Sequence, residues 1–275
     1  MTKIVLLVST LLFGFVGMAN EKEVSTLDNL VKKFEANPAD SQTTIQLLEE
    51  LKRQGKSNSD FVQRYFKTQK ESDYLKECNW KIIRDYVNDV HAPQFKYLFD
   101  NQAKFIQCYS KDDVMQKLDD TFVGYLEKFY NTDRAEYERQ LEILKNTGYE
   151  HYDVVADYFY IRQLRAERNS EDYFYKARKL FRYFPENRKM IKEITDGALE
   201  IMTDVSRLKV IQLWAGKTVE SKTDFDAIYN YVLISEKCGF TDIAKKYAEI
   251  ADELAKKSAN QAMMEKAKEL LKIVG

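Results

Sequence analysis

Residues 239–251 read GFTDIAKKYAEIA, and this segment decides the class of fold that the chain adopts. Gly239 comes shortly after the basic residue Lys237, which is the pattern of a glycine just past the end of a helix. Alanines then recur at helical spacing at positions 244, 248 and 251. Because such small side chains let two helix backbones approach closely, the segment predicts a closely packed helical hairpin.

The same helical period dominates the chain from residue 24 onward. Apolar residues recur every three or four positions over residues 79–90, 111–130 and 150–169. Only 9 glycines and 3 prolines occur, too few for the turns of a β-sandwich or the loops of a doubly wound α/β fold. We therefore predict an all-α chain of roughly thirteen to fifteen helices with short connections. The residues that punctuate the helices are Pro38, Gly55, Pro93, Gly148 and Pro185.

The C-terminal part resembles a tetratricopeptide repeat. Gly239 and the alanines after it are spaced like the turn glycine and the small residues of the second helix of such a repeat. Ala177-Arg178-Lys179 precedes Ala244-Lys245-Lys246 by close to two periods of about 34 residues, although Ile211 breaks the pattern between them. The resemblance, over residues 170–273, implies helical hairpins stacked as a tetratricopeptide-like α-superhelix. Irregular helical pairs are the alternative.

Residues 1–19 have the pattern of a secretory signal peptide. Lys3 supplies the positive charge, Ile4–Val16 is largely apolar, and Gly17-Met18-Ala19 places small residues at a cleavage site. The apolar stretch of about 13 residues is shorter than the roughly 20 that a membrane span needs, which disfavours an uncleaved anchor. We expect cleavage near Ala19 and a periplasmic helical repeat domain over residues 20–275, with no stable membrane span after cleavage.

The charged and reactive residues disfavour several classes of function. Lys and Arg number 43 and Asp and Glu number 44, whereas a nucleic-acid binder carries a basic excess. His91 and His151 are the only histidines, and no His-Glu-x-x-His or Cys-x-x-Cys motif occurs. The adjacent carboxylates of Asp112-Asp113 point about 100° apart on a helix, as do those of Asp119-Asp120, so neither pair can share one substrate atom. We expect no catalytic residues, no cofactor and no metal site.

A second resemblance concerns residues 25–140. It rests on FVQRYFKTQ at 61–69, NWKIIRDYV at 79–87, FKYL at 95–98 and KDDV at 111–114. These segments resemble the helical region that follows the thioredoxin domain in a group of exported bacterial thioredoxin-family proteins. The resemblance implies a helical module associated with a separately encoded thioredoxin-like partner. The family's Trp-Cys-x-x-Cys site is missing from this chain, so no catalytic residue carries over.

Three cysteines, Cys78, Cys108 and Cys238, leave their oxidation state open. A helix ending near Val90 and another starting near Pro93 would form an antiparallel hairpin with Cys78 and Cys108 at its open end. Three buried free thiols are the main expectation, and a disulfide between Cys78 and Cys108 is the alternative. Two tryptophans, Trp80 and Trp214, lie on apolar stripes, and we expect both to be mostly buried.

The candidate binding residues lie in the most aromatic part of the chain. On a helical wheel of residues 174–184, Tyr175, Arg178, Lys179 and Arg182 share the face opposite the apolar residues. Tyrosine and arginine are enriched at interaction hot spots, whereas the simpler interpretation is a solvated helix face. The sequence thus favours a non-catalytic module that binds a protein or peptide partner. The alternative is a glycan-binding or glycan-cleaving helical protein that uses tyrosines as stacking platforms.

Overall fold

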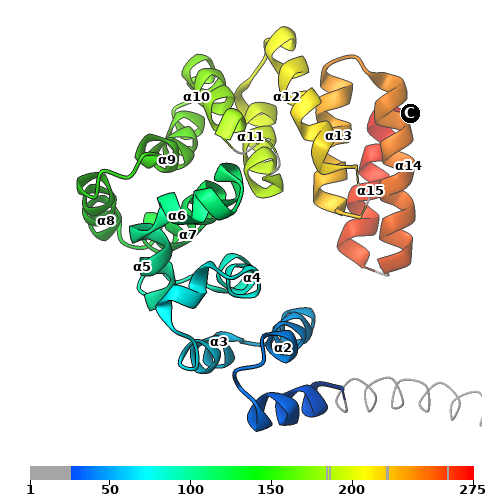
Figure 1. The fold of residues 1–275 in the computed structure, drawn as a ribbon. Helices are drawn as coiled ribbons and strands as arrows, with labels where there is room; N and C mark the ends of the chain where they lie inside the picture. The colour runs from blue at the N-terminus through cyan, green and yellow to red at the C-terminus, as the bar shows by residue number, and fades with distance from the viewer. Residues whose placement is uncertain (1–25, 184, 186, 221–222, 259) are drawn as a thin grey trace, which may run out of the picture. The chain divides into compact units, whose positions relative to one another are not determined.

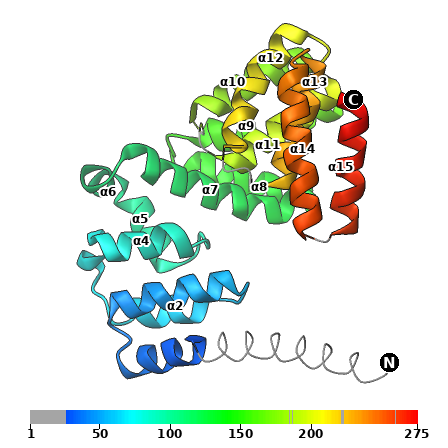
Figure 2. The same ribbon diagram turned by 90° about the vertical axis from the view of Figure 1, so that its right-hand side faces the viewer.

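The computed structural model describes residues 26–183, 185, 187–220, 223–258 and 260–275, and within these ranges every regular element is a helix. The predicted all-α helical-repeat fold is thus confirmed: consecutive helices pack against one another in pairs (Figures 1 and 2). The signal-peptide prediction for residues 1–19 lies outside the described residues. Among the described helices, none combines the length and apolar character that crossing a membrane requires.

The chain divides into two compact units, with the boundary between Tyr125 and Leu126. The first unit begins with a helix over residues 26–36 and contains most of α7. In it, α2 packs on α3 and α4, and the short 3-10 helix η1 packs on α4 and α6. The bounds of its elements are α2 Ser41–Arg53, α3 Ser59–Phe66, η1 Glu71–Leu75, α4 Glu77–Tyr86, α5 Pro93–Asp100, α6 Gln102–Cys108 and α7 Lys111–Tyr130.

The second unit is built in two layers of helices. Each helix from α9 onward packs on the next, and α9, α11, α13 and α15 also pack on one another in that order, which makes them one layer. In the other layer, the Phe181 ring of α10 stacks on the Trp214 ring of α12. The bounds are α8 Arg134–Asn146, α9 Tyr152–Ala166, α10 Ser170–Tyr183, α11 Arg188–Ile201, α12 Val205–Thr218, α13 Phe225–Lys237, α14 Thr241–Ser258 and α15 Gln261–Val274.

The α13–α14 hairpin has the features that the alanine spacing predicts. Gly239 adopts a φ of 78°, and the amide after it donates to the Ser235 carbonyl at 2.8 Å, which closes the end of α13. The α14 alanines at 244, 248, 251 and 255 are all fully buried. Their small side chains allow α14 to pack closely against both α13 and α15.

Helix starts are capped mainly by aspartate and asparagine side chains. Ser110 caps α7, because its hydroxyl accepts from the Asp113 amide at 3.1 Å. Ser258, by contrast, is the last residue of α14, and Asn260 caps α15. Short side chains with a carboxylate or amide oxygen reach the free amides of the first turn at little entropic cost. Such caps are Asp40, Asp133, Asn187, Asp204, Asp224 and Asn260.

Two local expectations need correction. The segment from Pro93 to Cys108 is not one arm of a hairpin, because the chain breaks at Asn101 into α5 and α6. All three cysteines are free, so the candidate Cys78–Cys108 disulfide is not formed. With the second arm bent, the open-ended hairpin that suggested this pairing does not exist.

The two tryptophans differ in burial. Trp80 is buried and stacks on Tyr109 with ring centroids 5.2 Å apart, as expected. Trp214 is only partly buried, because it lies at the edge of α12 against Phe181 of α10 rather than in the interior.

Candidate functional site

Helix α10 carries the candidate binding residues. The side chain of Asn169 accepts from the Asp172 amide at 3.2 Å and so caps the helix. One face of α10 is buried in the unit through residues three and four positions apart, which leaves the opposite face to solvent. The buried residues are Tyr173, Phe174, Ala177 and Leu180.

Three of the four predicted residues share the exposed face of α10. Tyr175 is 54% exposed, and Arg178 and Arg182 are exposed beside it at helical spacing. Within the described part of the chain, neither arginine forms an ion pair, and the guanidinium of Arg178 lies 5.9 Å from the centre of the Phe174 ring. These two positive charges are therefore available to a ligand.

The fourth predicted residue, Lys179, points elsewhere. Its ammonium lies 2.8 Å from a carboxylate oxygen of Asp157 on α9, while Lys176 binds the other oxygen at 2.7 Å. Asp157 is buried, so the two lysines compensate its charge. Burial lowers the pKa of Lys179, but the hydrogen bond to Asp157 and the negative charges of Asp157 and Asp153 together outweigh it, so that pKa is raised. Lys179 therefore holds α10 on α9.

Helix α12 extends the exposed surface, which sequence analysis of α10 alone missed. Trp214 stacks on Phe181 with ring centroids 4.4 Å apart and planes at 10°. The ammonium of Lys217 also lies over the Phe181 ring, 5.5 Å from its centre. Leu213, four residues before Lys217 and on the same side of α12, is 71% exposed. We call this surface the α10–α12 face: Tyr175, Arg178, Phe181, Arg182, Leu213, Trp214 and Lys217.

One sequence signal could have identified the α12 part of this face. Leu208, Ile211 and Ala215 already form the buried stripe of the helix. Leu213 lies on the opposite, polar side, so it cannot join the same core. A large aliphatic residue on the polar side of an amphipathic helix is a candidate contact residue.

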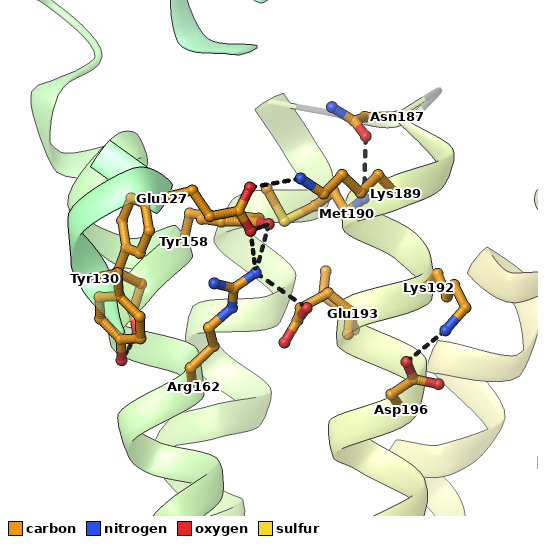
Figure 3. A network of polar contacts seen from close by, with 12 residues as sticks. Glu127, Tyr130, Tyr158, Arg162, Asn187, Lys189, Met190, Lys192, Glu193 and Asp196 are labelled. Atoms are coloured by element: carbon orange, nitrogen blue, oxygen red, sulfur yellow. Dashed lines mark hydrogen bonds and ion pairs between the residues drawn. The ribbon is translucent and has the colours of Figure 1, made fainter. Parts of the chain in front are cut away.

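The layer that contains α9 and α11 carries a cluster of charged side chains that pair with one another (Figure 3). One guanidinium nitrogen of Arg162 lies 2.8 Å from Glu127 and 3.2 Å from Glu193, and so ties the end of α7 to α9 and α11. The ammonium of Lys189 lies 2.7 Å from the second oxygen of Glu127. Although burial opposes it, hydrogen bonding from Lys189 and Arg162 lowers the pKa of Glu127.

The charges of this cluster cancel. Two carboxylates face two cations, and the hydroxyl of the buried Tyr158 accepts from Arg162 at 2.8 Å. Burial raises the pKa of Tyr158, which keeps its hydroxyl neutral. We therefore assign the cluster to holding α7, α9 and α11 together, in contrast to the α10–α12 face.

The first unit contains a pocket of about 660 Å³ between α3, η1 and the connection from α4 to α5. Its floor includes Phe66, Tyr74 and Tyr86, and all three rings are buried. A sugar-stacking platform needs rings whose faces are open to the ligand. The aromatic lining of this pocket therefore does not favour the glycan-binding alternative.

Each of the two histidines packs against a tyrosine ring of its own unit. His91 packs edge-on against Tyr125, and His151 packs against Tyr183. In the ranges that the structure describes, no group of three or more His, Cys, Asp and Glu side chains could hold a metal ion.

No protein-family model, curated protein or solved structure matches this chain. The arrangement best suited to contact another molecule is the α10–α12 face.

Proposed function

We propose that this protein is a non-catalytic helical-repeat module that binds a protein or peptide partner through the α10–α12 face. The observation that carries the proposal is the exposure of Leu213 next to a flat Phe181–Trp214 stack. A stacked ring pair with an adjacent aliphatic side chain presents apolar surface that binding would remove from water.

The composition of the face supports protein recognition. Tyrosine, tryptophan and arginine carry most of the binding energy in protein interfaces, and the face contains Tyr175, Trp214, Arg178 and Arg182. All four extend from helices, whose backbones are already ordered before a partner arrives. Little conformational entropy is therefore lost in forming the surface.

The setting of the module is part of the proposal. The signal-peptide pattern of residues 1–19 supports export to the periplasm. The resemblance of residues 25–140 to the helical region of exported thioredoxin-family proteins suggests a thioredoxin-like protein as one partner to test. The described helices would then act as a scaffold, since long helical-repeat surfaces suit protein binding.

A site-specific photocrosslinking experiment tests this function. The photoreactive residue p-benzoylphenylalanine replaces Leu213 in the full chain, and in a matched control it replaces Ile273, an exposed aliphatic residue of α15. We expect a protein adduct from position 213 in extracts of the producing organism. Unlabelled wild-type chain should compete for the adduct, whereas the Leu213→Ser variant should not.

Two results would contradict the proposal. One is the same adducts from positions 213 and 273, which would show unspecific contact. The other is the absence of any adduct from position 213 at a concentration where the photoreactive chain remains folded by circular dichroism.

A further inference from the structure

The charge of the α10–α12 face limits the chemical class of partner that can bind there. The inference drawn from it rests on the proposed function. We infer that the face binds an acidic segment of a partner protein, one whose carboxylates meet Arg178 and Arg182 while an apolar side chain packs on Leu213 and the Phe181–Trp214 stack.

The two arginines differ from most of the cations around them on α9, α10, α11 and α12, because seven of those are paired with carboxylates. Arg178 and Arg182 are one helical turn apart and exposed, and among the described residues neither has such a pair. The paired cations are Arg162, Arg165, Lys176, Lys179, Lys189, Lys192 and Arg207.

The chemistry of guanidinium selects carboxylates. Arginine presents a planar set of donors that matches a carboxylate in a two-point contact, and these charge-assisted hydrogen bonds are the stronger class. The spacing of four residues places Arg178 and Arg182 on one side of α10, so both can reach the same bound segment. Two unpaired positive charges on one face would also repel a basic segment.

The apolar part of the face requires more than charge from the ligand. Leu213 is 71% exposed, and Trp214 and Phe181 are each partly exposed along their stack. A purely acidic, hydrophilic segment would leave this surface in water. A segment with both acidic and apolar residues matches the entire face, as interfaces with an apolar centre and a charged rim do.

An anionic membrane is the main competitor, because it also attracts cations and apolar side chains. Recognition of an anionic lipid surface typically uses a cluster of about four to eight Lys and Arg residues. Within the described ranges, Arg178 and Arg182 are exposed cations of the α10–α12 face that form no ion pair, and Lys217 lies over Phe181. This density of charge favours a protein segment over a membrane surface.

Selection from a random peptide library displayed on phage tests the inference without assuming a partner sequence. The bait is the full chain, and the variants are Arg178→Gln with Arg182→Gln, and Leu213→Ser. The control is Lys268→Gln with Lys272→Gln, which removes two exposed charges at the same spacing on α15. All the substituted side chains are exposed, so melting temperatures should match that of the wild type.

We expect selected peptides to be rich in Asp and Glu together with Leu, Phe or Trp. The affinity of a selected synthetic peptide should fall by about tenfold or more in the double arginine variant and in Leu213→Ser, and stay unchanged in the lysine control. Replacing the peptide's Glu and Asp by Gln and Asn should weaken binding to the wild type by a similar factor.

The remaining outcomes each have a definite meaning. Selection of neutral or basic peptides whose binding still requires Leu213 would overturn the inference and leave the proposed function standing. No enrichment by the wild-type chain would overturn both. The wild-type chain could instead select no peptide but bind tightly to phosphatidylcholine vesicles that contain phosphatidylglycerol. If the double arginine variant loses this vesicle binding, the ligand of the face is a membrane surface and not a protein segment.

Discussion

Lys117 is a buried lysine whose removal should stabilise the protein. It lies on α7, is only 5% exposed, and donates to the side-chain oxygen of Asn88 at 2.9 Å. Burial lowers the pKa of Lys117 from 10.5 to about 8, because the nearby charges of Asp120 and Asp85 only partly offset the loss of water. At neutral pH the folded protein therefore holds a positive charge that its surroundings disfavour.

The size of this effect follows from the two pKa values. A difference of about 2.5 in pKa corresponds to roughly 3 kcal/mol between the charged and neutral forms. Lys117→Met keeps the length of the side chain and removes the charge. The exposed Asn88 amide can turn to water, so losing its hydrogen bond costs about 1 kcal/mol or less. We expect a net gain of about 2 kcal/mol in the free energy of unfolding near pH 7.

The sign of the pH dependence is a second test. The folded state releases its proton near pH 8 and the unfolded state near 10.5, so between these values the unfolded state binds more protons. Wild-type stability therefore rises with pH in this window, and the advantage of Lys117→Met should shrink by about 2 kcal/mol between about pH 7 and about pH 9.5. Taking the difference between the two proteins cancels the titration of tyrosines common to both.

The assay is urea unfolding followed by tryptophan fluorescence in a Trp214→Phe background. Trp80 then reports on the first unit, to which Lys117 belongs. Lys96→Met, a change at an exposed lysine of α5, is the matched control and should change stability by less than about 0.5 kcal/mol. A loss of stability in Lys117→Met, or an advantage that does not vary with pH, would refute the reasoning.

Three further predictions concern single residues. Gly197→Ala should lower the free energy of unfolding by about 1–3 kcal/mol, because the added Cβ would lie 2.1 Å from the hydroxyl oxygen of the buried Tyr173. If the same change costs as much in a Tyr173→Leu background, this contact is not the cause. Arg168 has a φ of 56°, which strains any residue with a Cβ, so Arg168→Gly should raise the free energy of unfolding by about 0.5–1 kcal/mol. Arg168→Ala keeps the Cβ and should bring no gain. Equal effects of the two changes would show that the backbone at this position is not strained. In a thiol titration with Ellman's reagent, the exposed Cys108 should react in the native protein and the buried Cys238 only after unfolding, and reaction of both at the same rate would contradict their assigned burial.

Periodicity predicted most of the helical architecture. The glycines at 55, 148 and 239 all adopt the positive φ expected just after a helix. Expectations failed where a single short side chain decides a local bend. Asn101 ends α5 and donates to the carbonyl of Tyr97 at 3.0 Å, which divides the segment that was expected to be one helix. Nothing in the apolar spacing marks that break.

The sequence predicted part of the candidate site. The wheel of α10 placed Tyr175, Arg178 and Arg182 on an exposed face, because a helix fixes which side chains share a side. The wheel could not separate Lys179 from them, since its direction depends on Asp157, a residue of another helix. Electrostatic pairing between helices is a property of their packing.

Local interactions along the chain therefore determined the helices, their ends and the alanine-lined hairpin, because helix periodicity, caps and turn glycines act within a few residues. Only the tertiary structure decided which charges are paired and which apolar side chains stay exposed. Leu213 and Trp214 join α10 in one surface because α12 lies beside it, and Arg162 is satisfied because three helices bring Glu127 and Glu193 to it. Whether a charge or an apolar group is available to a ligand depends on neighbours distant in sequence, and packing alone brings those neighbours together.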